Sequence, residues 1–305
     1  MKYLLIILFS SIVLSACEFK EKKATKGEKL KIVCTTGMLG DAVKNIVKNQ
    51  AEVSTLMGPG VDPHLYKATQ GDLKILSDAD IIIYNGLHLE GKMGEVFEKL
   101  KNRKTIIVAA DGINKADLIN TTEFQGAYDP HLWFDVDLWN RVVQYIGEKL
   151  SKLEQIDKNQ VLENSKNFQN ALSTLNDWVK SEIQKIAPER RVLITAHDAF
   201  GYFGRAYDIE VRGLQGISTV SEYGLKDVSD LVNFITERKI KAVFVESSVS
   251  ARSLNAVVEG CKSNGHPVKI GGTLYSDAMG EAGTAEGTYI GMVKYNVSSI
   301  VENLK

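Results

Sequence analysis

The sequence predicts an α/β protein built of two parallel-sheet lobes joined by one long helix. Short apolar runs alternate with longer segments whose apolar residues recur every three or four positions, which is typical of successive β–α units. This alternation occurs twice, once on each side of an amphipathic stretch that is longer than a helix within one lobe needs to be. The chain has 305 residues, which is enough for about two domains of ordinary size.

The first lobe, expected over residues 30–155, contains four apolar runs that we predict to be strands. Segments with helical periodicity separate these runs, so the strands should lie parallel, as they do in β–α–β units. The predicted strands are 31–36, 53–57, 80–85 and 105–109. The predicted helices are 38–49, 69–77 and 92–100, and a further helix, 137–153, follows a long loop.

Residues 157–186 are predicted to form a single amphipathic helix, because their apolar positions are three or four residues apart. At about 1.5 Å per residue this helix would extend about 45 Å, and Pro188 would end it. We therefore place the connection between the lobes at residues 156–188, and the second lobe at residues 189–305. The predicted strands of the second lobe are 191–196, 210–214, 241–246 and 268–273, and its predicted helices are 199–207, 228–238, 253–263 and 288–303.

Residues 1–16 have the pattern of a secretory signal peptide, with Lys2 followed by a largely apolar run over residues 4–14. This run is shorter than the roughly 20 residues that a membrane-spanning helix needs, so a retained transmembrane anchor is the less favoured interpretation. The sequence Leu-Ser-Ala-Cys at residues 14–17 resembles the bacterial lipobox, in which Cys17 would become the lipidated N-terminus. We then expect residues 17–29 to be a tether, and the protein to be exported and lipid-anchored, in the periplasm or at the cell surface.

The charge balance argues against a nucleic-acid partner, and the positions of the cysteines argue against a disulfide. The chain has 37 Lys and Arg against 38 Asp and Glu, so it has no excess positive charge with which to neutralise a nucleic-acid backbone. We therefore expect no nucleic-acid partner. Cys34 and Cys261 lie in apolar stretches of different lobes, and we expect buried free thiols rather than a disulfide.

Three of the five histidines, His64, His131 and His197, are expected in loops that follow strands or strand-loop segments. His64 and His131 share the local sequence Asp-Pro-His-Leu, in which proline fixes the backbone and holds the imidazole in a rigid turn. Asp277 follows the last predicted strand. Because open α/β sheets bind ligands beyond the carboxyl ends of their strands, we expect two side chains from each lobe to meet in the cleft between the lobes.

Three neutral imidazoles and one carboxylate form a four-ligand site suited to zinc first, with manganese or iron also compatible and calcium and magnesium disfavoured. The positions of these residues match no local zinc motif, so an alternative is that each histidine is a loop residue bonded to backbone or water. That alternative is our preferred interpretation of His88 and His266. Because a free imidazole titrates near 6.5, we expect the affinity for metal to decline below about pH 6.5.

Four motifs raise the metal hypothesis above the alternative. They are Met-Gly-Pro-Gly-Val-Asp-Pro-His at residues 57–64, Asp-Pro-His-Leu-Trp-Phe-Asp at 129–135, Ala-His-Asp-Ala-Phe-Gly-Tyr at 196–202 and Ser-Asp-Ala-Met at 276–279. In this order they resemble the solute-binding receptors of metal-specific ABC importers, the TroA/ZnuA type, and the match runs from about residue 30 to the C-terminus.

The resemblance implies a receptor, not an enzyme, that captures zinc or manganese outside the cytoplasmic membrane and delivers it to an ABC-type permease. It assigns the metal ligands to His64, His131, His197 and Asp277, and a monomer is expected. Manganese-selective relatives usually have a carboxylate where this chain has His197, and zinc receptors commonly have a long loop rich in histidine before the second ligand. Residues 111–128 contain no histidine, so the choice between zinc and manganese stays open.

Each ligating imidazole needs an acceptor for its other N–H group. Five acidic residues near the motifs are candidates, and each has an alternative role as a cap or turn residue. These candidates are Asp62, Asp129, Asp198, Glu222 and Glu246.

Two other functions stay open on the residues alone. In a zinc hydrolase three protein ligands hold the metal and water occupies the fourth position, so four protein ligands argue against that class. A surface adhesin of the same fold is suggested by the lipid tether, but no specific motif supports it. A single connecting helix also predicts that the lobes move by only a few degrees when the ion binds.

Overall fold

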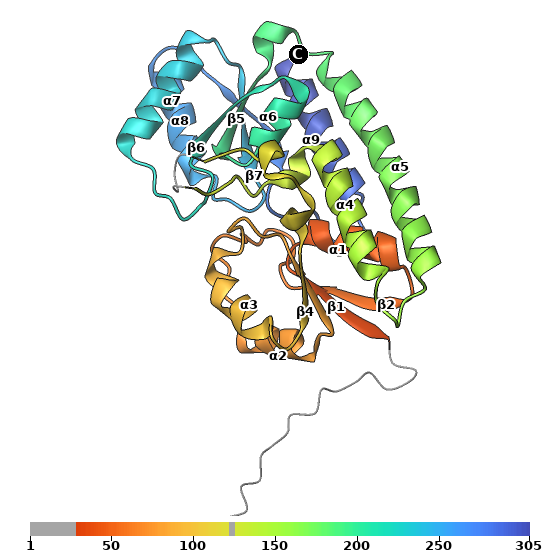
Figure 1. The fold of residues 1–305 in the computed structure, drawn as a ribbon. Helices are drawn as coiled ribbons and strands as arrows, with labels where there is room; N and C mark the ends of the chain where they lie inside the picture. The colour runs from red at the N-terminus through yellow and green to blue at the C-terminus, as the bar shows by residue number, and fades with distance from the viewer. Residues whose placement is uncertain (1–28, 122–125) are drawn as a thin grey trace, which may run out of the picture.

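The structure is a computed structural model that describes residues 29–121 and 126–305. The predicted signal peptide, Cys17 and nearly all of the predicted tether lie outside the described residues. Two four-stranded sheets, each with all strands parallel, form two lobes, as the sequence predicts (Figure 1). No helix within the described ranges is both long enough and apolar enough to cross a membrane.

The first sheet has the strand order β2-β1-β3-β4. Its central strands β1 and β3 are buried almost throughout, which explains why they are largely apolar in sequence. The strands are β1 (Leu30–Cys34), β2 (Ala51–Thr55), β3 (Ile81–Tyr84) and β4 (Thr105–Val108). The helices are α1 (Gly37–Val47), α2 (Gln70–Asp78) and α3 (Gly94–Leu100), the last preceded by a 3-10 turn, Gly91–Met93.

The second sheet repeats this topology in the order β6-β5-β7-β8. In both sheets the direction of the strand order reverses between the two central strands, which is where open α/β sheets bind ligands. The strands are β5 (Val192–His197), β6 (Glu210–Gln215), β7 (Ala242–Glu246) and β8 (Lys269–Leu274). The helices are α6 (Gly201–Tyr207), α7 (Leu225–Glu237), α8 (Arg252–Ser263) and α9 (Tyr289–Leu304).

Helix α7 begins earlier than the periodicity predicts. Its first turn carries Leu225, which is 90% exposed, so the apolar pattern does not mark it. The start is instead fixed by Asp227, whose carboxylate accepts a hydrogen bond from the backbone N–H of Gly224 at 2.8 Å. Capping of this kind satisfies backbone donors that have no partner within the helix.

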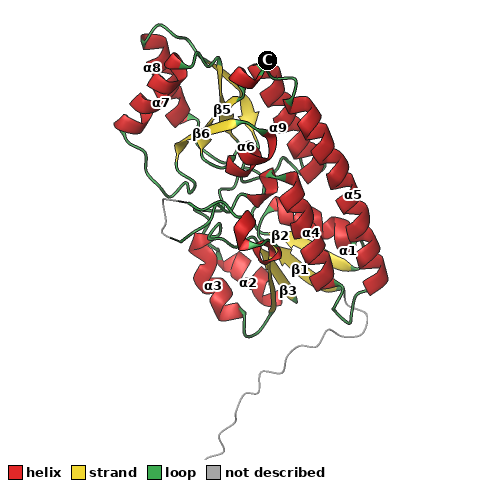
Figure 2. Ribbon diagram, turned by 45° about the horizontal axis from the view of Figure 1, so that its top comes forward, coloured by secondary structure: helices red, strands yellow, loops and turns green. Residues whose placement is uncertain are grey.

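Helix α5 (Lys158–Ile183) connects the lobes and lies alongside both (Figure 1). It starts where the carboxylate of Asp157 accepts hydrogen bonds from the N–H groups of Asn159 and Gln160. Figure 2 shows α5 together with α1, α9 and α4 (Val136–Leu150) on one side of the molecule, away from α2, α3, α7 and α8. The residue boundaries of the two lobes stay a prediction.

The two lobes share one hydrophobic core. Phe134 and Phe200 stack with their ring centroids 4.1 Å apart, and the indole N–H of Trp133 donates to the carbonyl of Ser276 at 3.0 Å. Tyr289 in turn donates its hydroxyl to the carbonyl of Trp133 at 2.7 Å. Close-packed contacts of this kind resist separation of the lobes.

We therefore expect little motion of the lobes when the site is loaded. Separating them widely would expose the stacked rings and break the buried hydrogen bonds of Trp133. Crystal structures of the protein with and without metal should differ by a rotation of a few degrees. A rotation of tens of degrees would refute this expectation.

Both cysteines in the described residues are buried and free, as predicted. Burial raises the pKa of the Cys34 thiol far above its ordinary value, which keeps the thiol protonated and unreactive. The Nε2–H group of His266 donates a hydrogen bond to the carbonyl oxygen of Ile240 at 2.7 Å, which is a structural role. His88 is exposed.

Candidate metal centre

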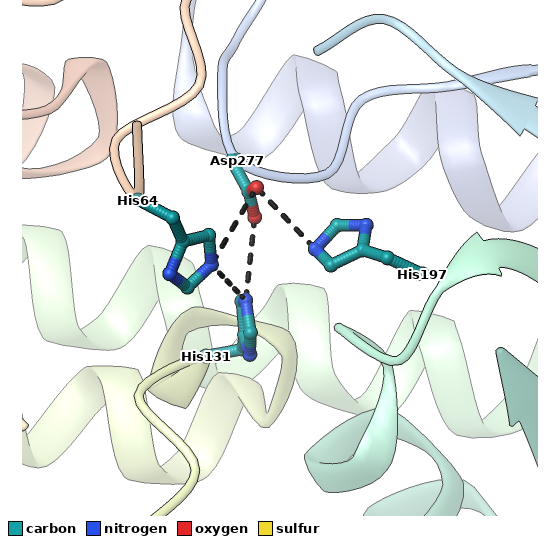
Figure 3. A group of neighbouring side chains, drawn as sticks. All are labelled: His64, His131, His197 and Asp277. Carbon is teal, nitrogen blue, oxygen red and sulfur yellow. Dashed lines mark hydrogen bonds and ion pairs between the residues drawn. The ribbon is translucent and has the colours of Figure 1, made fainter. Parts of the chain in front are cut away.

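Four side chains from distant parts of the sequence meet between the lobes (Figure 3). They are His64, His131, His197 and Asp277, and their ligand atoms all lie within 4.8 Å of one another. Each of the four residues is at most 3% exposed. The structure thus brings together the four residues that the sequence singles out, two from each half of the chain.

The two Asp-Pro-His sequences form the same local turn. Asp62 accepts a hydrogen bond from the backbone N–H of His64 at 2.8 Å, and Asp129 accepts one from the N–H of His131 at 2.9 Å. Aspartate commonly forms this bond to the backbone two residues ahead. The turn fixes the backbone position of each histidine, so the side chain loses little conformational entropy when the site binds an ion.

His197 departs from the prediction, because it is the last residue of strand β5 rather than part of a loop. It pairs with Gln215 of β6. Asp277 lies in the loop that follows β8, as predicted. A position at the end of a buried strand holds His197 more rigidly than a loop would.

Two buried acids orient the imidazoles. The Nδ1 atom of His131 lies 2.7 Å from Oδ1 of Asp129, and Nδ1 of His197 lies 2.5 Å from Oε2 of Glu246. Glu246 ends strand β7, and its other oxygen accepts a hydrogen bond from the backbone N–H of His197 at 2.9 Å. In both pairs the Nε2 atom is left facing the centre of the group, which is how metal-binding imidazoles are usually held.

Three of the predicted acidic neighbours lie elsewhere or act differently. Glu222 is exposed, which removes it from the buried surroundings of the imidazoles. Asp198 is not the acceptor for the neighbouring imidazole, because Glu246 occupies that side of His197. Asp62 contacts the backbone rather than the ring of His64, and its second oxygen accepts a hydrogen bond from the hydroxyl of Thr219 at 2.6 Å.

The sequence interpretation misses a buried network beside His131. Glu90 accepts hydrogen bonds from the hydroxyl of Thr35 at 2.6 Å and from the backbone N–H of Asn85 at 2.8 Å. The side-chain amide of Asn85 donates to the carbonyl of Pro130 at 3.0 Å, directly before His131. In the sequence, the pair Asn85-Gly86 at the end of a predicted strand hints at a polar turn there. No motif indicates that Glu90 is buried.

The carboxylate of Asp277 lies close to all three imidazoles. Oδ1 is 3.4 Å from Nε2 of His131, and Oδ2 is 3.3 Å from Nε2 of His197 and 3.9 Å from Nε2 of His64. Both oxygens are buried, and no described group donates a hydrogen bond of good geometry to them. The imidazole nitrogens are the groups that face this buried carboxylate, and a cation bound among them would neutralise its charge.

The electrostatics of the group are set by burial and by the facing charges. Burial opposes ionisation of Asp277, but the imidazoles of His197 and His131 outweigh it and hold its pKa well below the usual value. Burial also disfavours a charged His131 or His197, yet Asp129 and Asp277 raise the pKa of His131 to about 9, and Glu246 and Asp277 raise the pKa of His197 well above its usual value. Burial lowers the pKa of His64 to about 3.

The spacing of the donor atoms suits a small divalent transition metal. Ligand atoms bound at about 2.1 Å around a tetrahedral ion are about 3.4 Å from one another. The Nε2 atoms of His64 and His131 are 3.3 Å apart. The Nε2 atoms of His131 and His197 are 3.4 and 3.3 Å from the nearer carboxylate oxygen of Asp277. Because the two oxygens of Asp277 face different imidazoles, either one or both can bind an ion placed at the centre. The indole of Trp133 lies edge-on to His131, with centroids 5.2 Å apart, and supplies an apolar wall.

The chain matches the family described as ZnuA, zinc-uptake complex component A periplasmic, over residues 32–303. It is 48% identical to the manganese-binding lipoprotein MntA of Bacillus subtilis over 299 residues, which is 98% of this chain and 97% of that protein. It is 47% identical to the zinc-binding protein TroA of Treponema pallidum over 286 residues, which is 94% of this chain and 92% of that protein.

The fold comparison agrees with the sequence comparison. The solved structure of the periplasmic zinc-binding protein TroA from Treponema pallidum superimposes with a TM-score of 0.88 at 47% identity, covering 91% of this chain and 99% of that one. The resemblance inferred from the four motifs is therefore confirmed. The chain belongs to the ZnuA family of periplasmic zinc-uptake components.

Proposed function

We propose that the protein captures a divalent transition metal, zinc or manganese, outside the cytoplasmic membrane and delivers it to an ABC-type permease. The observation that carries this proposal is the buried group of three imidazoles and one carboxylate, whose donor atoms lie within 4.8 Å of one another. The relatives named as manganese-binding and zinc-binding proteins support it. Export, lipidation at Cys17 and a monomeric state belong to the same proposal.

We assign the metal ligands to His64, His131, His197 and Asp277. Asp129 and Glu246 act as positioning residues, because each lies against the Nδ1 atom of an imidazole whose Nε2 atom faces the centre. Four protein ligands fill a tetrahedral site and leave no open position for a reacting water. A receptor is therefore favoured over the zinc hydrolase, and family membership favours it over an adhesin.

The donor set accepts zinc, manganese or iron(II), with nitrogen donors favouring zinc and the two oxygens of Asp277 favouring manganese. The relatives divide in the same way, since one is named for manganese and another for zinc. Elemental analysis of protein purified without added metal, followed by competitive titration of zinc against manganese, tests the function. We expect about one ion per chain, and failure of both ions to bind would refute the proposal.

His197 is expected to control the choice between the two ions. Replacing its imidazole with a carboxylate exchanges a nitrogen donor for a hard oxygen donor, which should shift the ratio of affinities toward manganese by roughly tenfold or more. The new carboxylate would face Glu246, so the variant is best built as His197→Glu together with Glu246→Gln, and Glu246→Gln alone is the control. An unchanged ratio in competitive titration would show that His197 does not set selectivity.

A further inference from the structure

A cavity of about 410 Å³ lies between the lobes next to the candidate metal centre. Of the four proposed ligands only His64 lines it, together with Pro130 from the first lobe and Ser218 and Val220 from the second. The other three ligands lie behind His64 and are at most 2% exposed. An ion that enters or leaves through this cavity therefore passes His64.

A side-chain hydrogen bond ties the turn that carries His64 to the second lobe. The hydroxyl of Thr219 donates to Oδ2 of Asp62 at 2.6 Å, while Oδ1 of Asp62 accepts the backbone N–H of His64 at 2.8 Å. The two residues are 157 positions apart in the chain. Asp62 thus links the backbone of His64 directly to the opposite lobe.

Thr219 is itself held in place. The side-chain amide of Gln215, at the end of β6, donates to the carbonyl of Thr219 at 2.7 Å and to that of Ser221 at 2.6 Å. These bonds shape the loop whose residues Ser218 and Val220 form the wall of the cavity on the second lobe. The hydroxyl of Thr219 is therefore presented to Asp62 by a braced segment, and a hydrogen bond to a carboxylate is stronger than one between neutral groups.

We propose that the hydrogen bond between Thr219 and Asp62 is a latch between the lobes that sets how fast the bound ion is released. This proposal rests on the proposed function. For the ion to leave, the His64 turn must move away from the second lobe, and that movement breaks the latch. Thr219 is a positioning residue in this account, because it contacts neither the ion nor an imidazole but acts through Asp62. The contacts of Trp133 and Phe134 lie in the shared core and stay intact during such a local movement.

The test is the rate at which zinc passes from the loaded full-length protein to a chromogenic chelator in excess, followed by stopped flow. Thr219→Val keeps the size of the side chain and removes only the hydroxyl, and we expect dissociation to accelerate about tenfold, in keeping with the loss of one charge-assisted hydrogen bond. Thr219→Ala also lacks the hydroxyl and should accelerate release to a similar extent. Thr219→Ser retains the donor and should release zinc at the wild-type rate.

Thr236→Val is the matched control. The hydroxyl of Thr236 donates to the carbonyl of Val232 within helix α7, away from the turns that carry the proposed metal ligands. It should leave the dissociation rate unchanged. Denaturant unfolding of each metal-free variant separates a local effect from a loss of stability. Release within twofold of wild type in both Thr219→Val and Thr219→Ala, or equal acceleration in Thr219→Ser, would overturn the latch. A wild-type protein that binds no zinc would instead refute the proposed function.

Discussion

Replacing Asp277 with asparagine is expected to lower the affinity for zinc and for manganese by more than about 100-fold. This loss is larger than the one expected for a residue that only hydrogen-bonds to a metal ligand. Asp277 is the one anionic member of the proposed ligand set, and its two oxygens face His131 and His197 at 3.4 and 3.3 Å. The amide keeps the volume of the side chain but removes the negative charge that attracts the cation. Competition with a chelator of known affinity gives the measurement.

Asp41→Asn is the matched control for this variant. Asp41 is partly buried, and its carboxylate accepts the backbone N–H of Tyr289 at 3.1 Å, a bond that an asparagine oxygen can still accept. It lies on α1 beside a separate cavity. We expect Asp41→Asn to bind metal as the wild type does. An Asp277→Asn protein with affinity within threefold of wild type would show that this carboxylate does not hold the ion.

The affinity for metal is expected to fall steeply as the pH is lowered from about 9 to 6. An isolated imidazole predicts a decline that starts near 6.5, but the facing acids raise the pKa of His131 to about 9 and raise that of His197 well above its usual value. Below these values both rings carry a proton in the metal-free protein. A ring must lose that proton before it can bind the ion, so each lower pH unit weakens binding. The pKa directions of the folded site therefore move the expected pH range above the one that the residues alone predict.

Two protonated rings should give a change of about two logarithmic units in affinity per pH unit between pH 6 and 8, and His64, whose pKa is about 3, adds nothing in this range. Calorimetric titration in buffers with different heats of ionisation counts the protons directly, and we expect about two released per ion. An affinity that stays constant from pH 7 to 8.5, with no proton release, would contradict these pKa directions.

The fold could be predicted because its signals are local. The buried strands β1, β3, β5 and β7 are largely apolar runs, and α5 buries a residue at every third or fourth position, all of them apolar except Ser165. The turns that carry His64 and His131 were equally readable, because each is an Asp-Pro-His sequence whose aspartate binds the backbone two residues ahead.

The surroundings of the ligands could be predicted only in part, because they depend on contacts between distant segments. Asp198 is adjacent to His197 in the sequence, but successive side chains at a strand point to opposite sides. Glu246 ends strand β7, which lies next to β5 in the sheet, so the topology and not the sequence distance brings it to His197. Thr219 has no motif, and only the packing of the two lobes places its hydroxyl against Asp62.

In the proposed function, four side chains from the two halves of the chain bind one ion between the lobes. Diffraction data collected above and below the manganese absorption edge, from crystals grown with manganese, locate the bound ion. We expect a single strong anomalous peak, which marks an ion bound by the Nε2 atoms of His64, His131 and His197 and by the carboxylate of Asp277. A peak located elsewhere, or one that lacks ligands from either lobe, would contradict it.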